Sequence, residues 1–278
     1  MSGFTSFGGS AAATNPDITY ESVGWNTGTA TGVGILSGVA NTAGNWISVG
    51  TTVAAFSGFI LRVLTSDQAN GRLLFDISLD GGSTTYIPNV YAHVGSVANT
   101  RPASNIRLPM QVPAGSTISL RCRSSVASTT PIVDIIGILA SSTGVGPGFT
   151  TATAIEAADT TNTRPGTVAI NLSTGATTWT DLEASTAAQY GAVLMQCGAV
   201  SAVSAAQIVR ATLATGASTF EVPIGWADFY ESTTGPPIPN AQFLIEKTIP
   251  ISTPLSVSLQ AAAAGAPDTV TVGLIGFS

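Results

Sequence analysis

The sequence predicts an all-β protein made of two tandem antiparallel β-sandwich domains, jelly-roll-like in form, that arose by internal duplication. Three observations predict this class. Two long segments of the chain match each other, short alternating apolar runs are bounded by turn residues, and helical periodicity is weak. The 30 glycines and 15 prolines, which are spread along the chain, also fit an all-β protein.

The repeat is clearest around Trp46 and Trp179, from which the two copies run in register without a gap. Because these tryptophans share one repeat position, we expect both in the core. The matched segments are 45–49 with 178–182, 58–61 with 191–194, 78–86 with 212–220 and 133–138 with 270–275. The predicted organisation is an N-terminal arm over 1–24, a first sandwich over 25–141, a linker over 142–161 and a second sandwich over 162–278.

Each element follows from a local pattern. In the first copy, alternation places Leu73, Phe75 and Ile77 on one face of a strand, and the glycines of 80–82 then permit a tight turn. Long Pro-bearing loops separate later strands, which is typical of the crossovers of a Greek-key or jelly-roll sandwich. The predicted strands are 59–64, 72–79, 117–123 and 132–139 in copy one, with 206–213 and 255–259 among those of copy two.

Charged residues make up only 9% of the chain, against about 25% in a typical soluble domain. This deficit predicts a surface buried in an assembly, although a naturally Thr/Ser-rich β-protein is the plainer alternative. Copy one carries six arginines and four aspartates, a net +2, whereas copy two has three bases and seven acids, a net −4. Without a basic stripe or a long apolar span we expect no nucleic-acid partner and no membrane insertion. The start has no signal-peptide pattern, which predicts a protein made in a cytoplasm.

Residues that could carry chemistry are scattered. The single His, His93, has no counterpart in copy two, and Cys122 and Cys197 lie at different repeat positions, as buried thiols would. Asp76 and Asp80 flank a turn and could touch a calcium ion, but a turn acid is the plainer interpretation. We therefore expect no catalytic residue, no metal site and no cofactor. A hydrolase would need Asp228 or Glu231 close to a second carboxylate.

Six residues are candidate partner-binding residues. Phe4 and Phe7 could anchor the arm on a neighbour, unless the terminus is merely frayed. Arg121 and Arg123 project from one strand face and suit an acidic partner, or else a solvated surface. The remaining two are Trp226, which has no Trp counterpart in copy one, and Tyr230 nearby.

Short strands, scarce lysine and abundant Thr, Ser, Ala and Gly give the whole chain a composition that resembles bacteriophage virion structural proteins. No diagnostic motif carries the resemblance. It implies a non-enzymatic protein located in the virion, such as a capsid-decorating or cement protein, a head-fibre protein or a tail component. Its partners would be other virion proteins, and it would form a homo-oligomer such as a trimer. The alternative is a receptor- or glycan-binding module of a phage tail or surface adhesin, with Trp226, Tyr230 and the loop 235–240 as its site.

Overall fold

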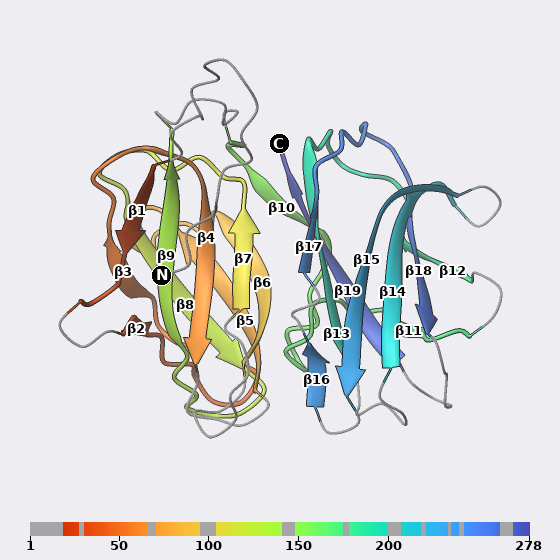
Figure 1. The fold of residues 1–278 in the computed structure, drawn as a ribbon, viewed down its shortest axis with the longest axis horizontal. Helices are drawn as coiled ribbons and strands as arrows, with labels where there is room; N and C mark the ends of the chain where they lie inside the picture. The colour runs from red at the N-terminus through yellow and green to blue at the C-terminus, as the bar shows by residue number, and fades with distance from the viewer. Residues whose placement is uncertain are drawn as a thin grey trace, which may run out of the picture.

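The computed structural model describes residues 19–27, 31–65, 71–94, 104–140, 148–174, 178–199, 207–217, 221–232, 235–238, 242–261 and 269–278. These residues form two jelly rolls of β-strands that lie side by side (Figure 1). The first contains β1 (Tyr20–Val23), β2 (Val33–Gly34), β3 (Ile47–Thr51), β4 (Phe56–Thr65), β5 (Gly71–Ser78), β6 (Ile87–Val94), β7 (Ser104–Leu108), β8 (Thr117–Ser124) and β9 (Ile132–Leu139). The second contains β10 (Ala152–Glu156), β11 (Ala169–Asn171), β12 (Trp179–Glu183), β13 (Ala192–Ala199), β14 (Gln207–Thr215), β15 (Val222–Ser232), β16 (Gly235–Ile238), β17 (Gln242–Ile245), β18 (Leu255–Ala261) and β19 (Thr269–Phe277).

The two jelly rolls share one strand order. We use "front" and "back" for equivalent sheets of the two jelly rolls, not for the side seen in Figure 1. The front sheet runs β1-β9-β4-β7 in the first and β10-β19-β13-β17 in the second, with β2 and β11 as matching additions. The back sheet runs β3-β8-β5-β6 in the first and β12-β18-β14-β15-β16 in the second. Neighbouring strands are antiparallel, and the chain crosses repeatedly between the sheets, as in a jelly roll. The predicted fold class is confirmed, and the shared order is what an internal duplication leaves.

Two close contacts fix the register of the repeat in the front sheets. A Cβ on Gly137 of β9 would lie 2.3 Å from the ring of Phe56, and one on Gly276 of β19 would lie 2.4 Å from the ring of Tyr190. Phe56 forms a bridge with Val112, just as Tyr190 does with Ile249. Each aromatic ring therefore fills the space above a glycine on the paired strand, so the four residues mark equivalent places.

This register corrects the sequence match by one residue in β4 and by two residues in β9, where Gly137 corresponds to Gly276 rather than to Leu274. Gly137 pairs with Phe59, and Gly276 pairs with Val193, so Phe59 corresponds to Val193 rather than to Ala192. A one-residue slip exchanges the two faces of a strand. The slip was invisible in the sequence because residues 192–195 are buried on both faces of β13, which removes the alternation that reports register.

Each jelly roll encloses its own apolar core between its two sheets. Phe59, Phe75 and Leu120 lie in the first core, and Val193, Phe229 and Val257 lie in the second. Trp46 and Trp179 are half-buried and lie outside both cores, so the core prediction for these residues was wrong. Both project from the outer face of a back sheet.

The predicted arm and the predicted linker each contain a strand. β1 pairs with β9, and β10 pairs with β19, so the two strands occupy equivalent edges of the two front sheets. Phe4 and Phe7 lie outside the described residues. Both Pro-bearing segments predicted as loops contain a strand. Segment 102–113 contains β7, and segment 235–240 contributes β16, which pairs with the end of β15.

The outer face of the second front sheet is buried against the first jelly roll. Leu194 and Ile275 join the apolar cluster of the first jelly roll, beside Ala192 and Phe277. The buried Gln196 accepts a hydrogen bond from the Tyr91 N–H at 2.6 Å. It also donates to the Asn89 carbonyl at 3.3 Å. Two further bonds cross the boundary, from Thr163 to Asn41 at 2.8 Å and between Arg107 and Glu246 at 3.1 Å.

Candidate binding surfaces

Trp226 lies on the outer face of the second back sheet with 64% of its surface exposed. The Arg210 guanidinium stacks on its indole, 4.7 Å from the ring centroid. The Nε and Nη2 atoms of Arg210 donate to the two carboxylate oxygens of Asp228 at 2.8 and 2.9 Å. Ile208, 59% exposed, projects from the same face. We call these four residues the platform.

An ion pair joins two residues of the platform, Arg210 and Asp228. The hydrogen bond from Arg210 lowers the pKa of Asp228, and the same bond raises the pKa of Arg210. Both groups therefore stay ionised at neutral pH, and the fork of two parallel bonds fixes the plane of the guanidinium beneath the indole. The lowered pKa makes Asp228 a poor general acid, which is one of the two carboxylate roles that the hydrolase alternative needs.

The same Trp–Arg–Asp arrangement occurs twice in the first jelly roll. On the back sheet, Arg121 donates to Asp76 at 2.8 Å and stacks on Trp46 at 4.7 Å. On the front sheet, Arg62 binds the fully buried Asp134 through both Nε and Nη2, and lies 5.5 Å from the ring centroid of Trp25. Sequence reasoning missed all three groups, because each joins residues from different strands and needs the sheet register to be seen.

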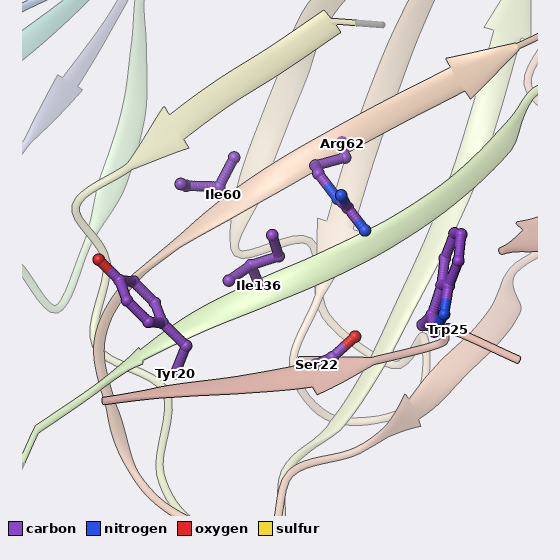
Figure 2. Close-up of a pocket in the computed structure, with 6 residues that line it drawn as sticks. All are labelled: Tyr20, Ser22, Trp25, Ile60, Arg62 and Ile136. Atoms are coloured by element: carbon purple, nitrogen blue, oxygen red, sulfur yellow. The ribbon is translucent and has the colours of Figure 1, made fainter. Parts of the chain in front are cut away.

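A hollow of about 660 Å³ opens on the outer face of the first front sheet (Figure 2). Apolar side chains of β4 and β9 form its floor, and aromatic residues stand at its sides. Its Arg62 is the arginine bound to Asp134. The lining residues are Tyr20, Ser22, Trp25, Ile60, Arg62 and Ile136. Tyr20 is 58% exposed and Trp25 37%, so two large aromatic side chains here remain open to a partner.

The other predicted partner-binding residues are dispersed. Arg121 is committed to Asp76 and Trp46, and Arg123 lies two residues further along β8, half-buried. Tyr230 lies in β15 opposite Ile208. Of the six candidates, the structure therefore brings Trp226 and the backbone of Tyr230 together in one strand, while the two arginines lie in the other jelly roll.

Polar groups predicted to be structural have defined partners. Asp80 accepts hydrogen bonds from the Ser78 hydroxyl and from the amides of Ser83 and Thr84, which closes the turn after β5. Cys122 and Cys197 are buried and unbridged, as expected, and burial raises the pKa of the Cys122 thiol. Within the described residues, no cluster of three or more His, Cys, Asp or Glu side chains has metal-site geometry. The described part of the chain has no helix long and apolar enough to span a bilayer.

Comparison with known proteins gives remote likenesses of fold. No family model and no curated protein matches the chain. Among solved structures, it is similar to a chain described as N-glycanase F (PNGase F), at 9% identity over 93% of this chain and 96% of that one, with a TM-score of 0.47. The STIV MCP matches at 10% identity over 94% and 96%, with a TM-score of 0.38. A chain of infectious bursal disease virus Gt strain matches at 12% identity over 96% and 74%, with a TM-score of 0.28. At these scores the likenesses carry no argument about function.

Proposed function

We propose that this chain is a non-enzymatic structural protein of a virus particle, of the capsid-decorating or head-fibre kind found in bacteriophages. The observation that carries the proposal is the contact between the jelly rolls. There the centre of a sheet face is buried by protein: Leu194 and Ile275 pack against the first jelly roll, and the Gln196 side chain is hydrogen-bonded to backbone groups of β6. One sheet face of this chain thus already serves as a contact surface between domains.

Composition supports the same proposal. A free subunit is usually kept apart from its copies by surface charge, whereas only 9% of this chain is charged. The platform and the hollow expose tryptophan, tyrosine and arginine, which are the residues most enriched where protein interfaces gain their energy. Both surfaces therefore suit contacts with other virion proteins or with further copies in a ring such as a trimer.

The test is the composition of purified particles. Mass spectrometry of virions from the source of this gene is expected to find the chain in a fixed ratio to the major shell protein. Immunogold labelling is expected to mark the particle surface. Absence of the chain from intact particles, with the protein recovered only in the soluble fraction, would overturn the proposal.

A second candidate is glycan or receptor binding at the platform. An exposed indole held flat by an arginine is a suitable surface for stacking the apolar face of a sugar ring. A glycan array with wild-type protein, Trp226→Ala and Trp46→Ala separates the two functions. Binding that Trp226→Ala abolishes and Trp46→Ala retains favours the adhesin, because both tryptophans stack on an arginine but lie on different jelly rolls.

A further inference from the structure

The hollow of the first jelly roll corresponds, residue by residue, to the buried contact face of the second. The equivalence of Gly137 with Gly276 places Ile136 where Ile275 lies, one residue earlier in each strand. Ile136 pairs with Ile60, and Ile275 pairs with Leu194, so Ile60 corresponds to Leu194. Two residues further along these strands, Arg62 corresponds to Gln196. The open hollow is thus built at the position that is covered in the sister domain.

The platform likewise corresponds to the surface of the first jelly roll that covers this face, at β5 and β6. The register is fixed by matching turns, in which the amides of Ser116 and Thr253 donate to Thr52 and Thr186. Counting along β8 and β18 then aligns Cys122 with Leu259, and the strand pairings carry this register to the neighbouring strands. The resulting equivalent pairs are Leu74 with Arg210, Asn89 with Trp226, and Tyr91 with Asp228.

These positions have opposite environments in the two jelly rolls. Leu74 and Tyr91 are buried, and the groups of Asn89 and Tyr91 that meet Gln196 lie at the boundary between the jelly rolls. A Cβ on Gly198 would lie 3.1 Å from the Tyr91 ring, so the boundary is tightly packed. Their counterparts in the platform face outward. The contact between the jelly rolls therefore uses one pair of surfaces, and the equivalent pair, the hollow and the platform, stays open.

We propose that the platform of one copy docks in the hollow of another copy, in the manner of the contact between the two jelly rolls. This inference rests on the proposed structural function and names its partner as a second copy of the chain. Each copy would then contribute one surface of each kind, so that association proceeds head to tail and closes into a ring or extends as a fibre.

Both surfaces present mainly apolar and aromatic groups. The hollow places Arg62, which is paired with Asp134, among apolar and aromatic side chains, and the platform places Trp226 and Ile208 beside the paired Arg210 and Asp228. The first repeat of the chain carries a net charge of +2 and the second repeat −4, which favours contact between unlike jelly rolls of two molecules over contact between like ones. β16 pairs with β15 beyond the platform. The edge strand of the proposed contact between molecules therefore differs from that of the contact between the jelly rolls, while the sheet faces correspond.

Complementation between two variants tests the head-to-tail arrangement. Trp226→Ala disables the platform, and Ile60→Glu disables the hollow; each variant retains the other surface intact. We expect native mass spectrometry and sedimentation of the wild-type chain to show multiples of 27.9 kDa. Each variant alone should self-associate roughly tenfold or more weakly. An equimolar mixture of the two should recover a 1:1 complex, because each supplies the surface that the other lacks.

Controls separate this result from misfolding and from other occupants. Trp46→Ala and Ile251→Glu, which make the same kinds of change away from both surfaces, should associate like wild type. Circular dichroism checks each fold, and Trp25→Ala replaces Ile60→Glu if the latter unfolds. A monomeric wild type, association only after removal of residues 1–18, or folded variants that fail to complement would each overturn the proposal. A monomer that is nevertheless found in particles would refute the docking and leave the structural function standing.

Discussion

The backbone N–H of Tyr91 donates to Gln196 at 2.6 Å across the boundary between the two jelly rolls. The same amide side chain donates to the Asn89 carbonyl, so both of its polar ends are used in a buried place. Gln196 thereby joins a strand edge of one domain to the sheet face of the other, and the two jelly rolls should unfold as one unit.

Replacing Gln196 by Ala is expected to destabilise the protein by about 1–3 kcal/mol, because the buried N–H of Tyr91 loses its acceptor. Urea denaturation followed by circular dichroism measures the change. Asn45→Ala, at an exposed position, serves as the control and should shift the midpoint little. Two separated transitions in the Gln196→Ala variant would show that this contact couples the domains. An unchanged midpoint would contradict its assigned role.

Two arginine–aspartate pairs of the same form should differ in their effect on stability. Arg62→Ala leaves the fully buried Asp134 without its partner, which costs roughly 3–5 kcal/mol. Arg210→Ala removes an exposed pair, which solvent screens, and should cost much less stability than Arg62→Ala. Thermal unfolding of both variants at neutral pH makes the comparison. If the two variants lose equal stability, burial is not what distinguishes the pairs.

The sequence predicted the architecture because alternation and turns are local. The inward positions Phe75 and Leu120 follow from the alternation of side chains along a strand, and the repeated tryptophans indicated the duplication. Burial of β13 on both faces erased that period, so the register of the repeat could not be read there. The strands in the predicted arm and linker were missed because each is short and is stabilised by pairing with a distant strand.

The sequence predicted some residues of the candidate surfaces but not the residues that pair with them. Trp226 was a candidate because it has no Trp counterpart in the repeat, and Asp228 was considered only as a carboxylate of a hydrolase. Its pairing with Arg210 gave no signal, since the two meet only when β14 and β15 pair. Trp46 looked like core for the same reason: its partner Arg121 is 75 positions away in the chain. Cross-strand partnership depends on register, which local patterns do not encode.

Equivalent glycines should respond alike if the repeat register is correct. Gly137→Ala and Gly276→Ala each place a methyl group against an aromatic ring, at 2.3 and 2.4 Å, and overpacking of this kind costs about 1–3 kcal/mol. Gly34→Ala is the control, since its nearest neighbour is the methyl group of Thr130 at 3.0 Å. The double variant Tyr190→Leu/Gly276→Ala should recover part of the loss. Tolerance of both single variants would argue against the assigned register.

Stability should fall at low pH through the turn that Asp80 closes. The hydrogen bond from the Ser78 hydroxyl, followed by that from the Thr84 amide, lowers the pKa of Asp80 from 3.8 to about 2. A depressed folded-state pKa contributes stability that is present above the unfolded value and is lost as pH falls toward 2. The difference in Tm between wild type and Asp80→Asn should therefore shrink as the pH is lowered through this window. Because the cause is hydrogen bonding rather than an ion pair, high salt should leave the profile in place. A Tm difference that stays constant from neutral pH down to the acid limit would show that the carboxylate is not held in its ionised form by this turn.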